Sequence, residues 1–147
     1  MPCTIRPARA DEADLLSDLA FRSKRAWGYD DLFMEACREE LHVTPESIGI
    51  CPTFVAESGG EIVGFYQLED DALSAMFVEP ERMRSGVGRA LCAHLTALAR
   101  ARRLAAVVIQ SDPNAQGFYE AMGAERIGET PSASIPGRLL PLLRLSL

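Results

Sequence analysis

The segment that decides the fold of this chain is ALSAMFVEPERMRSGVGR, residues 72–89. Its first part, Ala72 to Val78, has the apolar composition of a strand, and Pro80 ends that strand. A helix with a broad apolar face is predicted to begin at Gly86. The glycines of the connecting loop let backbone N–H groups approach a ligand closely, and the first turn of a helix carries partial positive charge. The segment therefore predicts an anion site between a strand and a helix.

The charge pattern around this segment supports an anion site in an acidic protein. The chain has 15 basic and 21 acidic residues and a formal net charge of −6, which argues against a general nucleic-acid binder. Acids and no Lys or Arg lie between Thr53 and Glu81, whereas arginines and no acid lie between Arg82 and Arg103. A bound pyrophosphate would offset the unfavourable place of Arg89 in the first turn of a helix. The alternative is a tight loop with solvated arginines.

The whole chain, residues 1–147, predicts a single domain of three layers, α/β or α+β in class. Antiparallel hairpins come first and strand–helix crossovers follow, in the order β-α-α-β-β-β-α-β-α-β-β. This order favours a mixed, mostly antiparallel central sheet of about 6–7 strands with about 4 helices, rather than a doubly wound dinucleotide fold. The predicted strands are residues 4–8, 53–57, 61–69, 72–78, 105–109, 124–128 and 143–147. The predicted helices are residues 11–25, a second one capped by Asp30 or Asp31, one from 86 and one over 112–122, with a loop between Pro45 and Pro52.

The cysteines give no indication of a metal site. Cys3, Cys37, Cys51 and Cys92 include no CxxC pair, and the histidines do not complete a zinc-ligand spacing. Reduced, packed cysteines are typical of a cytoplasmic protein. No apolar run approaches the roughly 20 residues that a membrane helix needs, so no membrane partner is expected.

A second motif, DPNAQGFYEAMGA at residues 112–124, follows the anion loop. Together with Val78-Glu79-Pro80 leading into Gly86-Val87-Gly88, it resembles the GNAT superfamily of acetyl-CoA-dependent N-acetyltransferases, and in particular bacterial members of unassigned substrate. The family's loop has the pattern Arg/Gln-x-x-Gly-x-Gly/Ala, and its later motif has Asn-Ala-x-x-Phe-Tyr followed by Gly-Ala or Gly-Phe. Met83 occupies the Arg/Gln position of this pattern, so the anion site lacks the polar side chain that the family has there. Arg82 or Arg84 can substitute for it.

The resemblance implies acetyl-CoA as co-substrate, no metal, and a role for each matching residue. The backbone of Phe77 and Val78 would pair with the pantetheine arm at a splay between two parallel strands. The pyrophosphate would be held by the amides of the loop and first helical turn: Arg84, Ser85, Gly86, Val87, Gly88 and Arg89. Asn114 would bond the pantetheine, with Phe118 packed nearby. Tyr119 would lie beside the thioester sulfur as general acid.

The acceptor amine must lose a proton before it attacks the thioester. Carboxylates near the predicted strand at residues 72–78 can take this proton directly or through water. The candidates are Glu69, Asp70 and Asp71. The alternative interpretation of these three residues is a solvated hairpin turn.

The acceptor side is predicted around the first two helices and a late loop. Trp27, Tyr29 and Phe33 can line an aromatic pocket for a small cationic amine, although a helix-pair core is the alternative. Arg138, in the loop at 132–138, could meet an acceptor carboxylate. We therefore expect transfer of the acetyl group to a primary amine of a small molecule within a ternary complex. The alternatives are a non-catalytic CoA-binding sensor or interaction module and a protein or peptide acetyltransferase, and the apolar last strand suits a homodimer interface.

Overall fold

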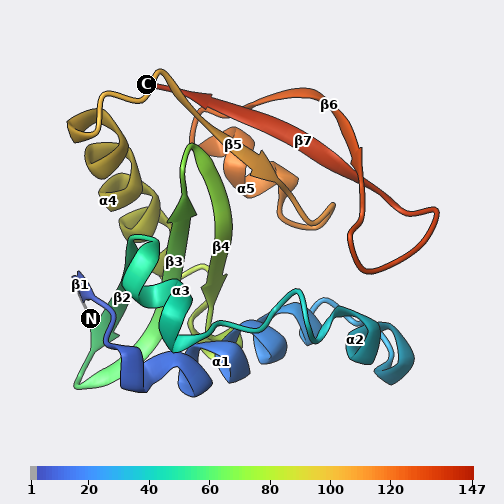
Figure 1. Ribbon diagram of the computed structural model, residues 1–147, viewed down its shortest axis with the longest axis horizontal. Coiled ribbons are helices and arrows are strands. Elements are labelled where there is room, and N and C mark those ends of the chain that lie inside the picture. The colour runs from blue at the N-terminus through green and yellow to red at the C-terminus, as the bar shows by residue number, and fades with distance from the viewer. Residues whose placement is uncertain (1–2) are drawn as a thin grey trace.

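The structure is a computed structural model that describes residues 3–147. One sheet runs through the molecule with the strand order β1-β2-β3-β4-β5-β7-β6 (Figure 1). Neighbouring strands are antiparallel except β4 and β5, which are parallel, so the predicted mixed, mostly antiparallel sheet is confirmed. The strands are β1 (Thr4–Pro7), β2 (Thr53–Ser58), β3 (Glu61–Glu69), β4 (Ala72–Val78), β5 (Ala106–Gln110), β6 (Glu125–Pro131) and β7 (Leu139–Ser146).

Helices cover both faces of this sheet. They are η1 (Ala10–Glu12), α1 (Ala13–Arg25), α2 (Asp31–Cys37), α3 (Pro45–Ile50), η2 (Pro80–Arg82), α4 (Val87–Ala101) and α5 (Gln116–Ala121). Side chains of α4 and α5 form one core with the sheet, and side chains of α1 and α2 form another. Phe65 and Tyr66 are neighbours in β3 yet belong to different cores, because successive side chains of a strand point to opposite faces. The three predicted layers follow from this arrangement.

Helix α3 occupies the segment for which the sequence predicted a loop. The side chain of Thr44 accepts a hydrogen bond from the backbone N–H of Ser47 (3.0 Å), and the Ser47 hydroxyl lies 3.2 Å from the Thr44 backbone nitrogen. Pro45 follows the cap at the first helical position. A capping box and a proline at the first position are ordinary signals for the start of a helix. The helix was not predicted because its six residues are too few to show a hydrophobic periodicity.

Strands β4 and β5 meet over a very short length. Their register pairs are Ala72 with Val108 and Leu73 with Ile109, and the strands then leave in different directions (Figure 1). Within residues 3–147, the remainder of β4 from Ser74 to Val78 has no strand on its β5 side. The fold therefore presents an open strand edge at the point where the sequence predicted a splay.

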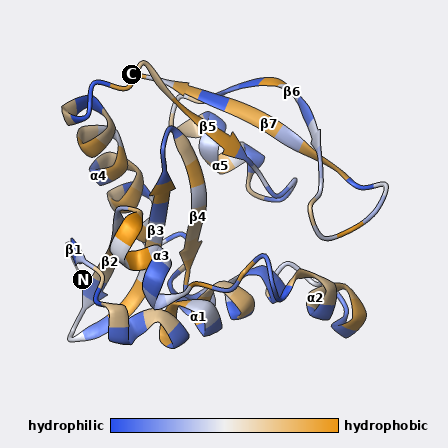
Figure 2. Cartoon of the chain, viewed as in Figure 1, coloured by the Kyte–Doolittle hydropathy of each residue, from blue (hydrophilic) through white to orange (hydrophobic). Residues whose placement is uncertain are grey.

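The last strand lies inside the sheet. β7 is largely hydrophobic in Figure 2, and it pairs with β5 on one edge and β6 on the other. Leu143 and Leu145 are buried in the same core as α4 and α5. The apolar composition that suggested a homodimer interface is therefore explained by the chain's own core. Among the helices of residues 3–147, none has both the length and the hydropathy required to cross a bilayer.

Candidate active site

The loop before α4 is shaped to present backbone N–H groups. Gly86 is the N-cap residue of α4 and has φ +94°, and Arg84 is also left-handed with φ +63°. Within residues 3–147, no side chain caps the start of α4, and the first turn of this helix contains no acid. The first N–H groups of a helix have no partner within the helix, so this end of α4 is suited to an anion.

The two sequence motifs meet at Gly88. A Cβ atom at this position would lie 3.1 Å from two ring carbons of Phe118 and 3.9 Å from the side chain of Val78. The glycine therefore lets α4 approach α5 and the end of β4 more closely than any other residue would. The structure thus brings together three of the residues that the resemblance assigned to acetyl-CoA.

The arginines of the loop surround this helix start. Arg84 and Arg89 are exposed, and neither forms an ion pair with any carboxylate in the part of the chain that the structure describes. Arg82 is half-buried, with its Nη1 atom 3.5 Å from the Ser58 hydroxyl, and its carbonyl accepts a hydrogen bond from the Ser85 hydroxyl. Two unpaired guanidinium groups are therefore available beside the backbone N–H groups.

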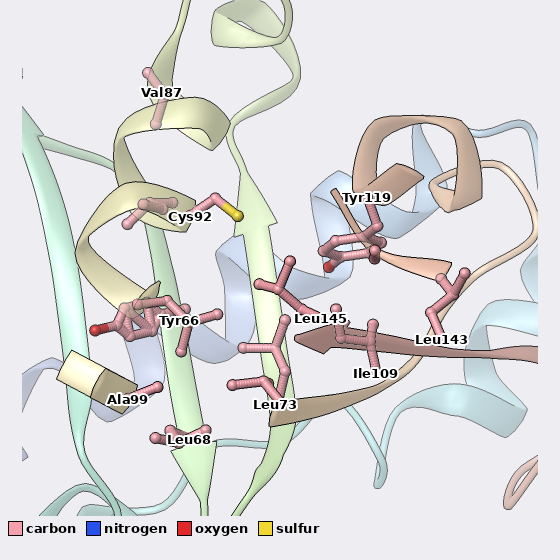
Figure 3. Packing of buried hydrophobic residues seen from close by; sticks show 14 of the residues in the cluster. Tyr66, Leu68, Leu73, Val87, Cys92, Ala99, Ile109, Tyr119, Leu143 and Leu145 are labelled. Atoms are coloured by element: carbon pink, nitrogen blue, oxygen red, sulfur yellow. The ribbon is translucent and has the colours of Figure 1, made fainter. Parts of the chain in front are cut away.

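Tyr119 projects from α5 toward the open edge of β4. The residue is 7% exposed, and Figure 3 shows its hydroxyl directed toward β4, as is the sulfur of Cys92 on α4. The hydroxyl forms no hydrogen bond with another residue of 3–147. Because every fully buried side-chain nitrogen or oxygen atom of these residues has a hydrogen-bond partner, the Tyr119 oxygen retains some exposure to solvent. Burial raises the pKa of this hydroxyl, and the nearby Cys92 and Asp112 raise it further. Tyr119 therefore keeps its proton at neutral pH.

A polar network lies on the acceptor side, around the carboxylate of Asp112. Its Oδ2 atom lies 3.1 Å from Lys24 Nζ and accepts a 2.8 Å hydrogen bond from the Tyr29 hydroxyl. Its Oδ1 atom accepts hydrogen bonds from the backbone N–H (2.8 Å) and side-chain amide (2.9 Å) of Asn114. The Tyr29 hydroxyl in turn accepts from Arg138 Nη2 (2.7 Å) and from the Asn114 amide (3.1 Å). We call these five residues the acceptor-side network.

The network fixes the charge state of its central groups. Burial favours a higher pKa for Asp112, but the hydrogen bonds from Asn114, Tyr29 and Lys24, together with the Lys24 charge, outweigh burial and lower that pKa. Burial and the neighbouring Asp112 raise the pKa of Tyr29. At neutral pH Asp112 is therefore an anion and Tyr29 a neutral hydrogen-bond donor.

Sequence reasoning missed two members of this network. No sequence pattern singles out Lys24, and Asp112 is predicted only as the cap of a helix. In the structure α5 begins only at Gln116, and Asp112 bonds Asn114 two residues later while it reaches Lys24 across 88 positions of sequence. No local pattern could have shown that contact.

The predicted aromatic residues divide into two groups. The rings of Tyr29 and Phe33 are stacked, with centroids 4.1 Å apart, and the guanidinium carbon of Arg138 lies 5.2 Å and 4.9 Å from those centroids. Trp27 is 42% exposed in the turn after α1 and takes no part in the network. The structure thus assembles Tyr29, Phe33 and Arg138 and leaves Trp27 outside.

The three carboxylates predicted as bases occupy the turn between β3 and β4. Glu69, Asp70 and Asp71 are all exposed, and Asp70 has the left-handed φ of +55° that a tight turn requires. Burial raises the pKa of the Cys51 thiol, and the charges of Glu69 and Asp70 raise it further. The carboxylate that raises the pKa of the Tyr119 hydroxyl is instead that of Asp112. The structure therefore does not bring the three turn carboxylates to Tyr119.

Comparison with known proteins identifies the family. The model of the acetyltransferase (GNAT) domain matches residues 16–133. The peptidyl-lysine N-acetyltransferase YjaB of Salmonella typhimurium is 31% identical over 147 residues, which cover 99% of this chain and 98% of that protein. The GCN5-related N-acetyltransferase from Rhodopseudomonas palustris superposes with a TM-score of 0.85 at 22% identity, over 100% of this chain and 97% of that one. The PaiA N-acetyltransferase from Thermoplasma acidophilum, solved in complex with coenzyme A, superposes with a TM-score of 0.78 at 15% identity over 100% of both chains.

The residues at the end of β4 and the start of α4 fit acetyl-CoA. The helix start is uncapped, the open edge of β4 leads to it, and unpaired arginines flank it. These are the partners that a pyrophosphate and an extended amide-containing arm require. Because the family model spans most of the sequence and a relative is similar along nearly its full length, this chain belongs to the GNAT family of acetyl-CoA-dependent N-acetyltransferases.

Proposed function

We propose that this acetyltransferase acts on the ε-amine of a lysine side chain in a protein or peptide. The observation that carries the proposal is the similarity, along 99% of the chain, to a protein named as a peptidyl-lysine N-acetyltransferase. Two hollows of the described chain, of about 290 and 330 Å³, lie away from Tyr119, Tyr29 and Arg138, so neither of these two would hold an acceptor beside the reacting atoms.

The co-substrate would lie along the open edge of β4. Acetyl-CoA supplies the acetyl group as an activated thioester. The backbone of Phe77 and Val78 would pair with its amide-containing arm, and Asn114 and Phe118 would contact that arm from the other side. Its pyrophosphate would accept hydrogen bonds from the backbone N–H groups of the loop and first helical turn, Arg84, Ser85, Gly86, Val87, Gly88 and Arg89, with the charges of Arg84 and Arg89 nearby.

Tyr119 would serve the sulfur that departs when the amine displaces it. Its raised pKa keeps the hydroxyl protonated, so it can donate a hydrogen bond to the sulfur as negative charge develops there. A phenol with a pKa of about 10 or higher is a weaker acid than a thiol at about 8.5, so complete transfer from Tyr119 alone is uphill. The neutral amine carries the proton that balances the reaction: one N–H remains in the amide and the other proton ends on the sulfur, with Tyr119 as relay.

The acceptor side would supply position more than basicity. The carboxylate of Asp112 raises the pKa of Tyr119. Its own lowered pKa and its four hydrogen-bonding contacts nevertheless make it a weak base. The ammonium form of the lysine would therefore lose its proton to water before attack. Holding both reactants together then supplies much of the acceleration.

Thiol release from acetyl-CoA tests this proposal. The acceptors are an N-terminally blocked peptide with one lysine, the same peptide with arginine in place of lysine, the arginine peptide with a free N-terminus, and a panel of small primary amines. We expect release only with the lysine peptide. Release with small amines alone would overturn the proposal, release with the free N-terminus alone would assign the α-amine, and no release with any acceptor would indicate a CoA-binding module without turnover.

A further inference from the structure

The acceptor side holds more positive than negative charge. Lys24 and Arg138 both approach the single carboxylate of Asp112, at 3.1 Å and 3.6 Å. The three side chains are 13%, 18% and 12% exposed, so water has little access to them. The chain as a whole has a formal net charge of −6, whereas this shielded site has a net positive charge.

The hydrogen-bonding capacity of the central groups is already used. Asp112 receives Lys24 and Tyr29 on one oxygen and two N–H groups of Asn114 on the other. The Tyr29 hydroxyl donates one hydrogen bond and accepts two, which is its full capacity. Arg138 spends Nη2 on Tyr29, and its Nε and Nη1 atoms form no hydrogen bond with any group of residues 3–147. The N–H donors of the network that remain free therefore belong to its cationic side chains, Arg138 and Lys24.

The surrounding charges do not balance this surplus. Glu40 is exposed, its carboxylate accepts a hydrogen bond from the Ser134 hydroxyl, and it forms no ion pair with Lys24 or Arg138 in the described chain. Glu79 is paired with Arg22 at 2.8 Å. The rings of Tyr29 and Phe33 lie against the Arg138 guanidinium, where they exclude water on their side and strengthen a charge-assisted hydrogen bond.

We propose that Arg138, supported by Lys24, binds a carboxylate that the acceptor carries on its reactive lysine or on the residue next to that lysine. The inference rests on the proposed lysine acceptor and narrows it. In a peptide the carboxylate belongs to an Asp or Glu adjacent to the lysine, and in a free acceptor it is the α-carboxylate. The site lies close to the reacting atoms, because Asp112 and Asn114 of the same network lie in the loop that leads directly into α5, the helix that carries Tyr119. Arg138 is in this account a specificity-determining residue.

The first arm of the test uses matched peptides. Each is blocked at both ends and contains one lysine, with Glu or Gln at the preceding or following position. We expect the wild type to have a kcat/KM about 10-fold higher for a Glu peptide than for its Gln partner, as for one charge-assisted hydrogen bond. Arg138→Gln should reduce this ratio to about 1, and Arg138→Lys should restore part of it. The ratio does not depend on how much enzyme is folded.

A control variant and a second acceptor pair complete the test. Arg144→Gln removes the same charge from an exposed position of β7 and should leave the ratio unchanged. Nα-acetyl-lysine compared with its carboxamide reports a preference for a free α-carboxylate and distinguishes that source from an acidic neighbour. Calorimetric titration of the Glu and Gln peptides into the enzyme saturated with CoA measures the same preference without turnover.

Two results would overturn the inference. One is the absence of any preference for a carboxylate in all acceptor pairs, in turnover and in binding. The other is a preference that persists in Arg138→Gln. If no lysine acceptor turns over while the Glu peptide still binds more tightly than the Gln peptide through Arg138, then the proposed reaction fails and the carboxylate site stands.

Discussion

The two halves of the site are built in different ways. The cofactor half, from the end of β4 through the start of α4 to Phe118, is made mainly of backbone, glycines and an open strand edge. The acceptor half is made of side chains from α1, the turn after it, the end of β5 and the loop before β7. A backbone site depends on local conformation and has a sequence motif. A side-chain site assembled from distant segments has none, and this is why the family is evident from the sequence and the acceptor is not.

The largest effect should come from removal of the charge at the centre of the acceptor half. Asp112→Asn leaves Lys24 and Arg138 without their shared anion, and we expect the free energy of unfolding to fall by about 3 kcal/mol. Asp31→Asn is the matched control, because Asp31 pairs with Arg25 while 85% exposed, and it should change stability by less than about 0.5 kcal/mol. Urea denaturation measures both.

The pH dependence of this loss has a defined sign. The pKa of Asp112 is lower in the folded protein than the value of about 3.9 for an unfolded chain. Its stabilising contribution is therefore complete well above pH 4 and is lost as the pH falls through the folded pKa. Wild type and Asp112→Asn should converge in acid. A constant difference down to low pH, or a loss no greater than that of the control, would contradict a central role for this carboxylate.

Tyr119→Phe tests the point where the two halves meet. If the hydroxyl serves the departing sulfur, kcat should fall by about 100-fold while the KM for acetyl-CoA changes little, because the ring remains. Tyr66→Phe removes another buried tyrosine hydroxyl, one hydrogen-bonded with His94 Nδ1 at 2.7 Å, and should cost about 1 kcal/mol of stability at unchanged kcat. Full activity in Tyr119→Phe would show that water protonates the sulfur.

The smallest effect concerns the arginines of the cofactor half. Arg84→Glu should weaken CoA binding by about 10-fold, and the loss should shrink at high salt because salt screens exposed charges. Arg103→Glu is a close control: Arg103 is also exposed, with φ +62° against +63°, but lies at the opposite end of α4. Equal Kd values for the two variants by calorimetry would remove Arg84 from the site.

The difference between the halves also explains which sequence predictions succeeded. The strands, α1, α2 and α4 follow from hydrophobic periodicity and caps, and the cap at Asp30 is confirmed by its hydrogen bond to the Phe33 N–H. The splay after Leu73 and the contact of Phe118 with Gly88 agree with the family motifs. The contact of Lys24 with Asp112 could not be predicted, because it depends on how α1 packs against the sheet, at β4, and not on either local sequence.

Hydrogen exchange of backbone amides with and without CoA tests most directly where the co-substrate lies. We predict that saturating CoA slows exchange in residues 76–78 and 84–89, at the open edge of β4 and the start of α4, because those N–H groups would gain partners. Residues 24–33 and 132–138, on the acceptor side, should change little until a lysine peptide is added. Protection confined to those acceptor-side segments, or no protection at any concentration of CoA, would contradict the account.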